Sequence, residues 1–343
     1  MKSEPVSPST GVGVLHLFCK PTPMFEAEAA VAAVKEAESA GCQVVTISML
    51  GHKCDVAVMA IHENLRELRA LQTAVQHAGL DIVEGNETAL DDKTACFVVQ
   101  NPDFTGAIRD ITPLSDAAHA KGALVVWDLS HSAGNMSVEL NACDADFAVG
   151  CGYKYLNGGP GAPAYVFVAK HHQHEFDHPL TGWLGHADPF AFAPEYVPAR
   201  GMNKLLTGTP PILSLLALDA ALDVFDGVDM RQVRAKTESL TQLFVDLAGE
   251  RLLRHGFTLA SPREAKHRGG QVSLSHREGY AIMQALIARG VIGDYRAPDT
   301  VRFGFAPLYT RHIDVYDAVA VIDDVMTNRA WDTPAFKARK AVT

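Results

Sequence analysis

The chain has 343 residues, a formal net charge of −10 and 48% hydrophobic residues, a composition that is ordinary for a globular protein. One hydrophobic core rarely serves more than about 300 residues, so we expect two lobes. The acidic balance disfavours nonspecific contact with nucleic acid, whose phosphates attract basic surfaces. No apolar run reaches the roughly 18 residues that a membrane-spanning helix needs. We therefore expect a globular protein with neither a nucleic-acid nor a membrane partner.

The N-terminal segment and the cysteines bear on where the protein works. Residues 1–12 are polar and rich in Pro and Ser, without the apolar core of a signal peptide, so we predict a disordered leader. The six cysteines are scattered and include no C-x-x-C pair. In a chain of this length they indicate reduced thiols, and hence a cytoplasmic protein.

Strands and helices alternate through the first two thirds of the chain. Apolar periodicity and glycine stops predict, in order, helix 26–39, strand 44–47, helix 64–77, strand 95–99, helix 113–121, and strands 123–128, 146–150 and 164–168. This alternation predicts an α/β fold with a mostly parallel sheet covered by helices. Ligands of such sheets bind beyond the carboxyl ends of the strands. We therefore expect Asp128, Ser130, His131, Tyr153 and Lys154 to be neighbours.

The pattern changes after about residue 210. Two long helices are predicted over 212–225 and 230–252, followed by strand 270–275, helix 278–289, strand 301–305 and helix 315–326. These elements predict a linking helix and a smaller α+β lobe. We predict a large α/β domain over 13–225 and a C-terminal domain over 226–343.

One segment matches the zinc-protease pattern H-E-x-x-H, namely His174-Glu-Phe-Asp-His178. The pattern binds zinc only on a helix, where both imidazoles share one face. Pro179 follows directly and disfavours helical backbone at His178. We therefore interpret the segment as a solvated polar loop and predict no metal site.

Asp128 ends an apolar strand, where a carboxylate is costly to bury without a partner. A protonated pyridine nitrogen is one such partner, because the carboxylate keeps the ring cationic and able to accept electrons. The alternative is that Asp128 caps the turn that follows the strand. Position alone favours neither interpretation.

Lys154 lies between two tyrosines, after a predicted buried strand and before Asn157-Gly-Gly-Pro160. A partly desolvated lysine has a lowered pKa and can form an imine with an aldehyde. Glycines allow backbone to approach a bulky ligand closely. Most lysines are solvated surface residues, but the neighbours of Lys154 favour a reactive lysine.

Six segments carry a specific resemblance, and together they span about residues 105–343. They are Trp127-Asp-Leu-Ser-His-Ser-Ala-Gly134, Tyr153-Lys-Tyr-Leu-Asn-Gly-Gly-Pro-Gly161, Pro179-Leu-Thr-Gly-Trp-Leu-Gly-His186, Thr207-Gly-Thr-Pro-Pro-Ile212, Gly279-Tyr-Ala-Ile-Met-Gln-Ala-Leu-Ile-Ala-Arg-Gly290 and Thr300-Val-Arg-Phe-Gly-Phe-Ala-Pro-Leu-Tyr309. In order and spacing they resemble kynureninase.

The resemblance implies a fold-type-I enzyme that uses pyridoxal 5′-phosphate (PLP), a homodimer with active sites at the subunit interface. It implies a hydrolase of tryptophan catabolism that cleaves the Cβ–Cγ bond of L-kynurenine or 3-hydroxykynurenine to give anthranilate (or its hydroxylated form) and L-alanine. The resemblance also implies a role for each site residue. Lys154 forms the imine, Asp128 meets the pyridine nitrogen, and His131 lies near the ring. Tyr153 contacts the phosphate and moves protons, while Trp183 and Thr209 hold the phosphate, one or both from the partner subunit. Arg302 binds the substrate α-carboxylate.

The N-terminal third lacks the family's phosphate-binding turn and ring-stacking aromatic, so we expect a divergent and shortened part of the large domain. Residues 42–110 weakly resemble the first subunit of the glycine-cleavage decarboxylase, another fold-type-I enzyme. Thr46, Ser48, Gly51 and His52 either form a substitute phosphate loop or ring-stacking element, or are ordinary loop residues.

Three interpretations follow. The chain is a kynureninase-like hydrolase, a PLP lyase or decarboxylase for another amino acid, or a degenerate homologue that acts as a partner subunit. The presence of Asp128, His131, Tyr153, Lys154 and Arg302 argues against the third, because a scaffold needs none of them.

Overall fold

The computed structural model describes residues 13–21, 25–50, 56–62, 67–68, 70–71, 74–75, 78, 80–81, 96–176, 178, 180–296 and 299–339. The chain divides into two compact units. The first comprises residues 1–100 and 113–126, and the second comprises residues 101–112 and 127–343. The leader expected over 1–12 lies outside the described residues, and the domain boundary expected after residue 225 stays a prediction.

The first unit contains a sheet with the strand order β4-β1-β3-β2-β5-β6. Its elements are β1 (Gly13–Pro21), α1 (Ala27–Ser39), β2 (Gln43–Leu50), β3 (Val56–His62), β4 (Leu80–Asp81), β5 (Cys96–Gln100), most of α3 (Ile111–His119) and the start of β6 (Leu124–Asp128). β2 runs parallel to β5, as expected, whereas β3 pairs antiparallel with both β1 and β2. Only five residues join β2 to β3. So short a connection permits a hairpin, because a parallel crossover needs a dozen or more residues.

The core of the first unit forms under α1. Ala33 and Ala37 are four residues apart, so they share one helix face, and both are buried. They belong to one apolar cluster with Val58 and Ala60 of β3 and with Leu71. Alanine is the best helix former and its small side chain allows the helix to pack closely on neighbouring elements.

The second unit contains a strand pair and a second sheet. β7 (Phe147–Cys151) and β8 (Ala164–Val168) pair antiparallel, and the four-stranded sheet has the order β11-β12-β10-β9. The strands of that sheet are β9 (Thr258–Leu259), β10 (Gln271–Ser275), β11 (Asp294–Arg296) and β12 (Thr300–Gly304). Its helices are α4 (Ile212–Leu222), α5 (Met230–Arg251), α6 (Gly279–Ala288), α7 (His312–Thr327) and α8 (Pro334–Lys337). Short 3-10 turns are at Trp183–Gly185, Pro189–Ala191, Gly201–Leu205, Asp223–Phe225, Leu253–His255 and Ala265–His267.

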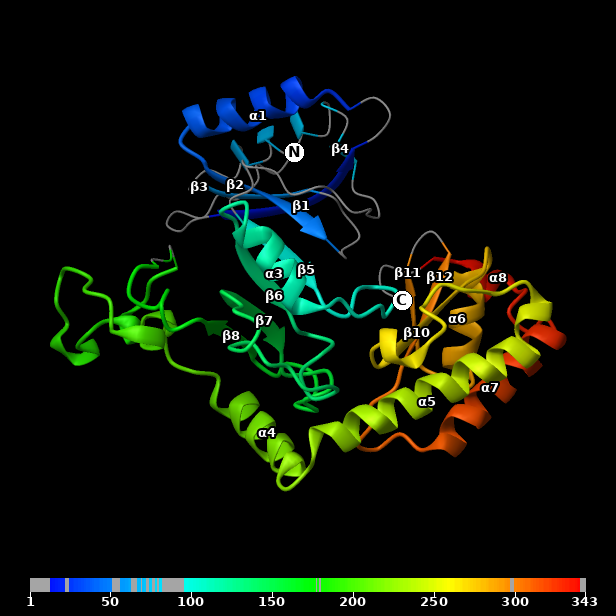
Figure 1. The fold of residues 1–343 in the computed structure, drawn as a ribbon. Coiled ribbons are helices and arrows are strands. Elements are labelled where there is room, and N and C mark those ends of the chain that lie inside the picture. The colour runs from blue at the N-terminus through cyan, green and yellow to red at the C-terminus, as the bar shows by residue number, and fades with distance from the viewer. Residues whose placement is uncertain are drawn as a thin grey trace, which may run out of the picture. The chain divides into compact units, whose positions relative to one another are not determined.

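The larger core lies in this unit, where α5 and α7 run side by side (Figure 1). Leu240 and Phe244 of α5 are fully buried at helical spacing, as are Val319 and Ile322 of α7. Phe244 also packs its ring at 5.1 Å from that of Phe303 on β12. The helices and the four-stranded sheet therefore share one core, and that core supports the strand that carries Arg302.

Most predicted elements agree with the structure to within a few residues, including the helices over 26–39 and 230–252 and the strands over 123–128 and 146–150. Of the helix predicted over 64–77, the structure describes Glu67, Leu68, Ala70, Leu71, Ala74 and Val75, all of which are helical. β1 and β3 were not predicted. Their short apolar runs have no flanking turn signals as clear as those of the later strands.

Helix α4 differs from the other long helices because none of its residues is buried. Leu213 is 85% exposed and Leu216 is 58% exposed, although the helix is strongly apolar. Apolar side chains in this number are costly to leave in water. The described part of the chain contains no helix that is long and apolar enough to cross a membrane.

Candidate active site

An open cavity of about 420 Å³ lies within the second unit. Four of the predicted site residues line it: His131, Tyr153, Lys154 and Arg302. They come from three separate stretches of the chain, which follow β6, follow β7 and form β12. The structure therefore gathers an amine, a phenol, an imidazole and a guanidinium around one space large enough for a small organic ligand.

Lys154 lies on a tight loop that follows β7. The amide N–H of Asn157 donates to the carbonyl oxygen of Lys154 over 3.0 Å, and that of Gly158 donates to Gly152 over 2.9 Å. A Cβ atom at Gly158 would lie 2.8 Å from the Gly152 carbonyl oxygen, so only glycine allows the loop to close so tightly. The Lys154 Nζ atom lies 5.3 Å from the centre of the Tyr153 ring. The loop thereby holds a partly buried amine at the cavity wall.

Asp128 ends β6, where its side chain caps the following turn, and its expected role at a pyridine nitrogen stays a prediction. Its Oδ1 atom accepts a hydrogen bond of 2.9 Å from the Ser130 amide, which confirms the turn-capping interpretation. Its negative charge also raises the pKa of His131 and of Tyr153, so the carboxylate lies within electrostatic reach of the cavity. Asp128 is not one of the residues that line the cavity. One oxygen can cap the turn while the other stays available to a cation.

His131 is held neutral. Burial, together with the positive charges of Lys154 and Arg302, lowers its pKa to about 4, although the charges of Asp128 and Asp294 oppose the shift. The Nδ1 atom is buried without a hydrogen-bond partner among the described residues. A buried polar atom without a partner is costly, and it marks a place where a ligand can supply the missing contact.

Tyr153 is half exposed and keeps its proton at neutral pH. The neighbouring Cys151 thiol raises its pKa most, followed by burial and by the charge of Asp128. The phenol can therefore donate a proton but is a poor base in the free protein. Its neighbour Tyr155 has its pKa raised by burial and donates to the carbonyl oxygen of Gly270 over 2.8 Å.

Arg302 projects from β12 and is almost buried, with 11% of its side chain exposed. Its Nε and Nη2 atoms donate to the two carboxylate oxygens of Asp294, over 2.7 Å and 2.5 Å. Although burial alone would raise the pKa of Asp294, the bonds and charge of Arg302 hold it below its usual value. Sequence reasoning missed Asp294. A possible signal was that a buried arginine needs a carboxylate partner on a neighbouring strand.

Trp183 and Thr209 do not line the cavity. Both side chains are exposed, and the Trp183 ring packs edge-on against Phe190 at 5.9 Å. Within the chain they are therefore not gathered with Lys154. Their expected contact with a phosphate from the partner subunit stays a prediction.

The predicted loop is wrong for Thr46 and Ser48 and stays a prediction for Gly51 and His52. Gly51 and His52 lie outside the described residues. Thr46 and Ser48 lie within β2, where their backbones face Val58 and Val56 of β3. These two residues are therefore in a strand rather than a loop.

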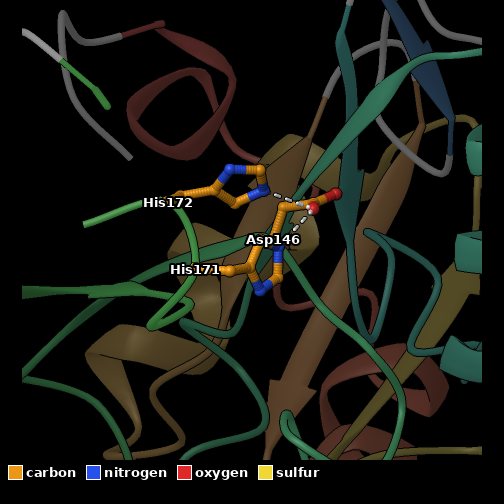
Figure 2. A group of neighbouring side chains, drawn as sticks. All are labelled: Asp146, His171 and His172. Atoms are coloured by element: carbon orange, nitrogen blue, oxygen red, sulfur yellow. Dashed lines mark hydrogen bonds and ion pairs between the residues drawn. The ribbon is translucent and has the colours of Figure 1, made fainter. Parts of the chain in front are cut away.

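The histidine-rich segment follows β8, and Figure 2 shows His171 and His172 beside Asp146. Their potential metal-ligating atoms lie within 4.8 Å of one another. The His172 Nε2 atom is hydrogen bonded to the buried Asp146 carboxylate over 2.7 Å, and the His172 ring stacks on Phe147 at 5.2 Å. These contacts account for the cluster as an anchor for the turn after β8.

The H-E-x-x-H match next to this cluster lacks the geometry of a zinc site. Residues 174 and 175 lie in a turn and residue 176 has no regular structure, so none of the three is helical. The His178 Nε2 atom is paired with the Lys204 carbonyl oxygen over 2.7 Å. That segment is therefore a loop, as expected from Pro179.

Solved structures show which fold the chain has. A cysteine desulfurase from Thermococcus onnurineus NA1 aligns with a TM-score of 0.60 at 19% identity, covering 76% of this chain and 70% of that one. A C-DES variant with glycine covalently linked to its PLP cofactor aligns with a TM-score of 0.61 at 15% identity, covering 87% and 86%. The fold is that of the fold-type-I PLP-dependent enzymes, as predicted from the sequence.

Sequence relatives are more specific. Residues 233–322 match the kynureninase C-terminal domain. The chain is 49% identical over 256 residues to a kynureninase of Burkholderia mallei, covering 74% of this chain and 62% of the relative. It is 44% identical over 265 residues to a kynureninase of Pseudomonas fluorescens, covering 77% and 64%. The predicted resemblance to kynureninase is confirmed, and the chain spans less than two thirds of the length of these relatives. The weaker resemblance of residues 42–110 to the decarboxylase stays a prediction.

Proposed function

We propose that the chain binds PLP in the cavity and hydrolyses the Cβ–Cγ bond of L-kynurenine or 3-hydroxykynurenine, releasing L-alanine. The observation that carries this proposal is that Lys154 and Arg302 line the same cavity. An amine that can bind an aldehyde therefore shares one cavity with a guanidinium that can bind an α-carboxylate. The kynureninase resemblance supports this choice of substrate over other amino acids.

The residues present fit PLP. The Lys154 amine can bind the aldehyde, and the Asp128 oxygen that does not cap the turn can accept the proton of a pyridine nitrogen. The buried Nδ1 atom of His131 has no hydrogen-bond partner among the described residues, and a substituent of the PLP ring could supply one. When bound, PLP supplies an electron sink for the bond that breaks.

Each side chain would have a separate task in the reaction. Arg302 would hold the α-carboxylate and so orient the substrate amine toward Lys154. Lys154 would then move the proton at the substrate Cα, and water would add to the side-chain ketone so that its carbon leaves as the carboxylate of anthranilate. Tyr153, which keeps its proton at neutral pH, would deliver one to the substrate Cβ. The neutral His131 would add no charge that competes with Lys154 or Arg302.

A homodimer is part of this proposal. The apolar side chains of residues 180–225 support it, because Phe190 and Phe192 are 72% and 85% exposed and α4 buries none of its residues. A second copy could cover this surface and bring Trp183 and Thr209 to the neighbouring cavity. The thiols of Cys42, Cys143 and Cys151, which are not in disulfides, support a cytoplasmic location.

Titration of the purified protein with PLP tests the cofactor first. We expect a visible absorbance band that Lys154→Ala abolishes and that Lys170→Ala, on an exposed residue after β8, leaves unchanged. L-kynurenine is then added, and the fluorescence of anthranilate is followed.

The two measurements separate the alternatives. A protein that shows no visible band with PLP would contradict every enzymatic interpretation. A band without anthranilate would contradict kynurenine as substrate and favour a lyase or decarboxylase for another amino acid.

A further inference from the structure

The ion pair between Arg302 and Asp294 is built into two neighbouring strands. The two residues face each other in the antiparallel register of β11 and β12. A Cβ atom at Gly293 would lie 2.4 Å from the Arg302 carbonyl oxygen, so a glycine is required for β11 to approach β12 this closely. The backbone therefore places the carboxylate of Asp294 against the guanidinium of Arg302 at the cavity wall.

The pairing uses only one side of the guanidinium. A guanidinium has five N–H donors in a planar fork, and Asp294 accepts from Nε and from one N–H of Nη2. Among the described residues, Nη1 makes no hydrogen bond. The edge formed by Nη1 and the second N–H of Nη2 is therefore left for another carboxylate, which can bind it with two parallel hydrogen bonds.

The local charge also leaves room for an anion. The Asp294 carboxylate is shared with Arg296, whose Nη2 atom lies 3.1 Å from Oδ2. One negative charge thus faces two guanidinium groups, and the low pKa of Asp294 keeps it ionised near neutral pH. Asp294, Arg296 and Arg302 together therefore carry a net positive charge.

We propose that Asp294 is a positioning residue, which fixes the plane of the Arg302 guanidinium so that its free edge receives the α-carboxylate of the substrate. This inference rests on the proposed function, in which Arg302 binds that carboxylate. It differs from a model in which Asp294 competes with the substrate for Arg302. A positioning residue tightens carboxylate binding, whereas a competitor weakens it.

The test compares Asp294→Asn with wild type, both loaded with PLP, because asparagine keeps the shape and one acceptor but loses the charge. Calorimetric titration with L-alanine and with L-alaninamide measures the carboxylate contribution directly. We expect the variant to bind L-alanine about 10- to 100-fold more weakly, the effect of one charge-assisted hydrogen bond, and to bind the amide unchanged. KM for L-kynurenine should rise by a similar factor, with a smaller change in kcat.

Asp324→Asn is the matched control. Asp324 forms an ion pair of 2.9 Å with Arg289, and neither residue lines the cavity. The control should leave both titrations unchanged. Tighter or unchanged L-alanine binding by Asp294→Asn would overturn the inference. So would a parallel loss of acid binding, amide binding and PLP affinity, which indicates a purely structural role.

The wild-type protein separates this inference from the proposed function. If the wild-type protein prefers L-alanine to the amide but forms no anthranilate, the proposed substrate is wrong. A loss of that preference in Asp294→Asn would still support the positioning role. If the wild-type protein binds acid and amide equally, Arg302 is not a carboxylate site, and the inference fails with it.

Discussion

Tyr155 donates its phenolic hydrogen to the carbonyl oxygen of Gly270 over 2.8 Å, in a buried position directly after Lys154. Gly270 precedes β10, the strand that pairs with β12, which carries Arg302. A Cβ atom at Gly270 would lie 2.7 Å from the Tyr155 hydroxyl, so this contact depends on glycine. The bond ties the loop of the proposed imine-forming lysine to the sheet of the proposed carboxylate-binding arginine.

Tyr155→Phe should therefore destabilise the protein. The change removes one of the two hydrogen bonds that the Gly270 carbonyl oxygen accepts, the other coming from the Phe305 amide over 2.7 Å. We expect it to lower the free energy of unfolding by about 0.5–1.5 kcal/mol. Urea denaturation followed by circular dichroism measures this. Tyr309→Phe, at a side chain that is 70% exposed, is the control and should change stability by less than about 0.5 kcal/mol. Equal effects of the two changes would contradict a structural role for the buried bond.

Gly134→Ala should lower the free energy of unfolding by more than left-handed backbone strain alone explains. Gly134 has φ +84°, and an added Cβ atom would lie 2.4 Å from the Tyr155 carbonyl oxygen. We expect a loss of about 2–4 kcal/mol, the sum of left-handed strain and overpacking. Gly161→Ala separates the two contributions, because Gly161 has φ +85° with nothing within 4 Å of an added Cβ. It should lose only about 1 kcal/mol. A similar loss in both variants would refute the close contact.

The stability of the protein without added PLP should fall as the pH drops from about 6.5 to about 4. Because burial and the charges of Lys154 and Arg302 depress the pKa of His131 to about 4, the unfolded chain takes up a proton before the folded one. Above pH 6.5 both states are neutral at this site, and below pH 4 both are protonated. His131 should account for a loss of roughly 3 kcal/mol across that window.

The share that belongs to His131 is isolated by substitution. His131→Asn should remove that part of the pH dependence, as measured by denaturation at a series of pH values. His174→Asn, on an exposed loop residue, should leave it unchanged. If His131→Asn keeps the full wild-type slope, another group causes the pH dependence.

The proposed dimer predicts that charge on α4 will separate the subunits. Leu213→Asp combined with Leu216→Asp should lower the mass measured by light scattering toward that of one chain, because both side chains are exposed within a single subunit. Ile313→Asp, on α7 at a side chain that is 51% exposed, should leave the mass unchanged. A wild-type protein that is already monomeric at micromolar concentration would contradict the dimer.

Much of the proposed site could be predicted from local sequence, because the strands that carry it are recognisable from their own residues. Apolar runs that end in glycine or a polar residue placed β6 and β7 within a residue or two. Lys154 and Asp128 were then expected at strand ends, where ligands of such sheets bind. The kynureninase resemblance extended this to Arg302, which lies far along the chain but lines the same cavity.

The N-terminal strands were harder to predict. Whether β2, β3 and β1 pair parallel or antiparallel depends on which strands meet in space, and their short apolar runs do not encode that choice.

The amino-acid sequence by itself therefore determined the class of fold, the family resemblance and the residue that should carry the chemistry. Only the tertiary structure revealed Asp294 as the partner of Arg302 and Gly270 as the acceptor for Tyr155. These pairs join residues through strand register and buried hydrogen bonds. Such contacts form between distant segments only after the core has packed, so no local sequence pattern predicts them.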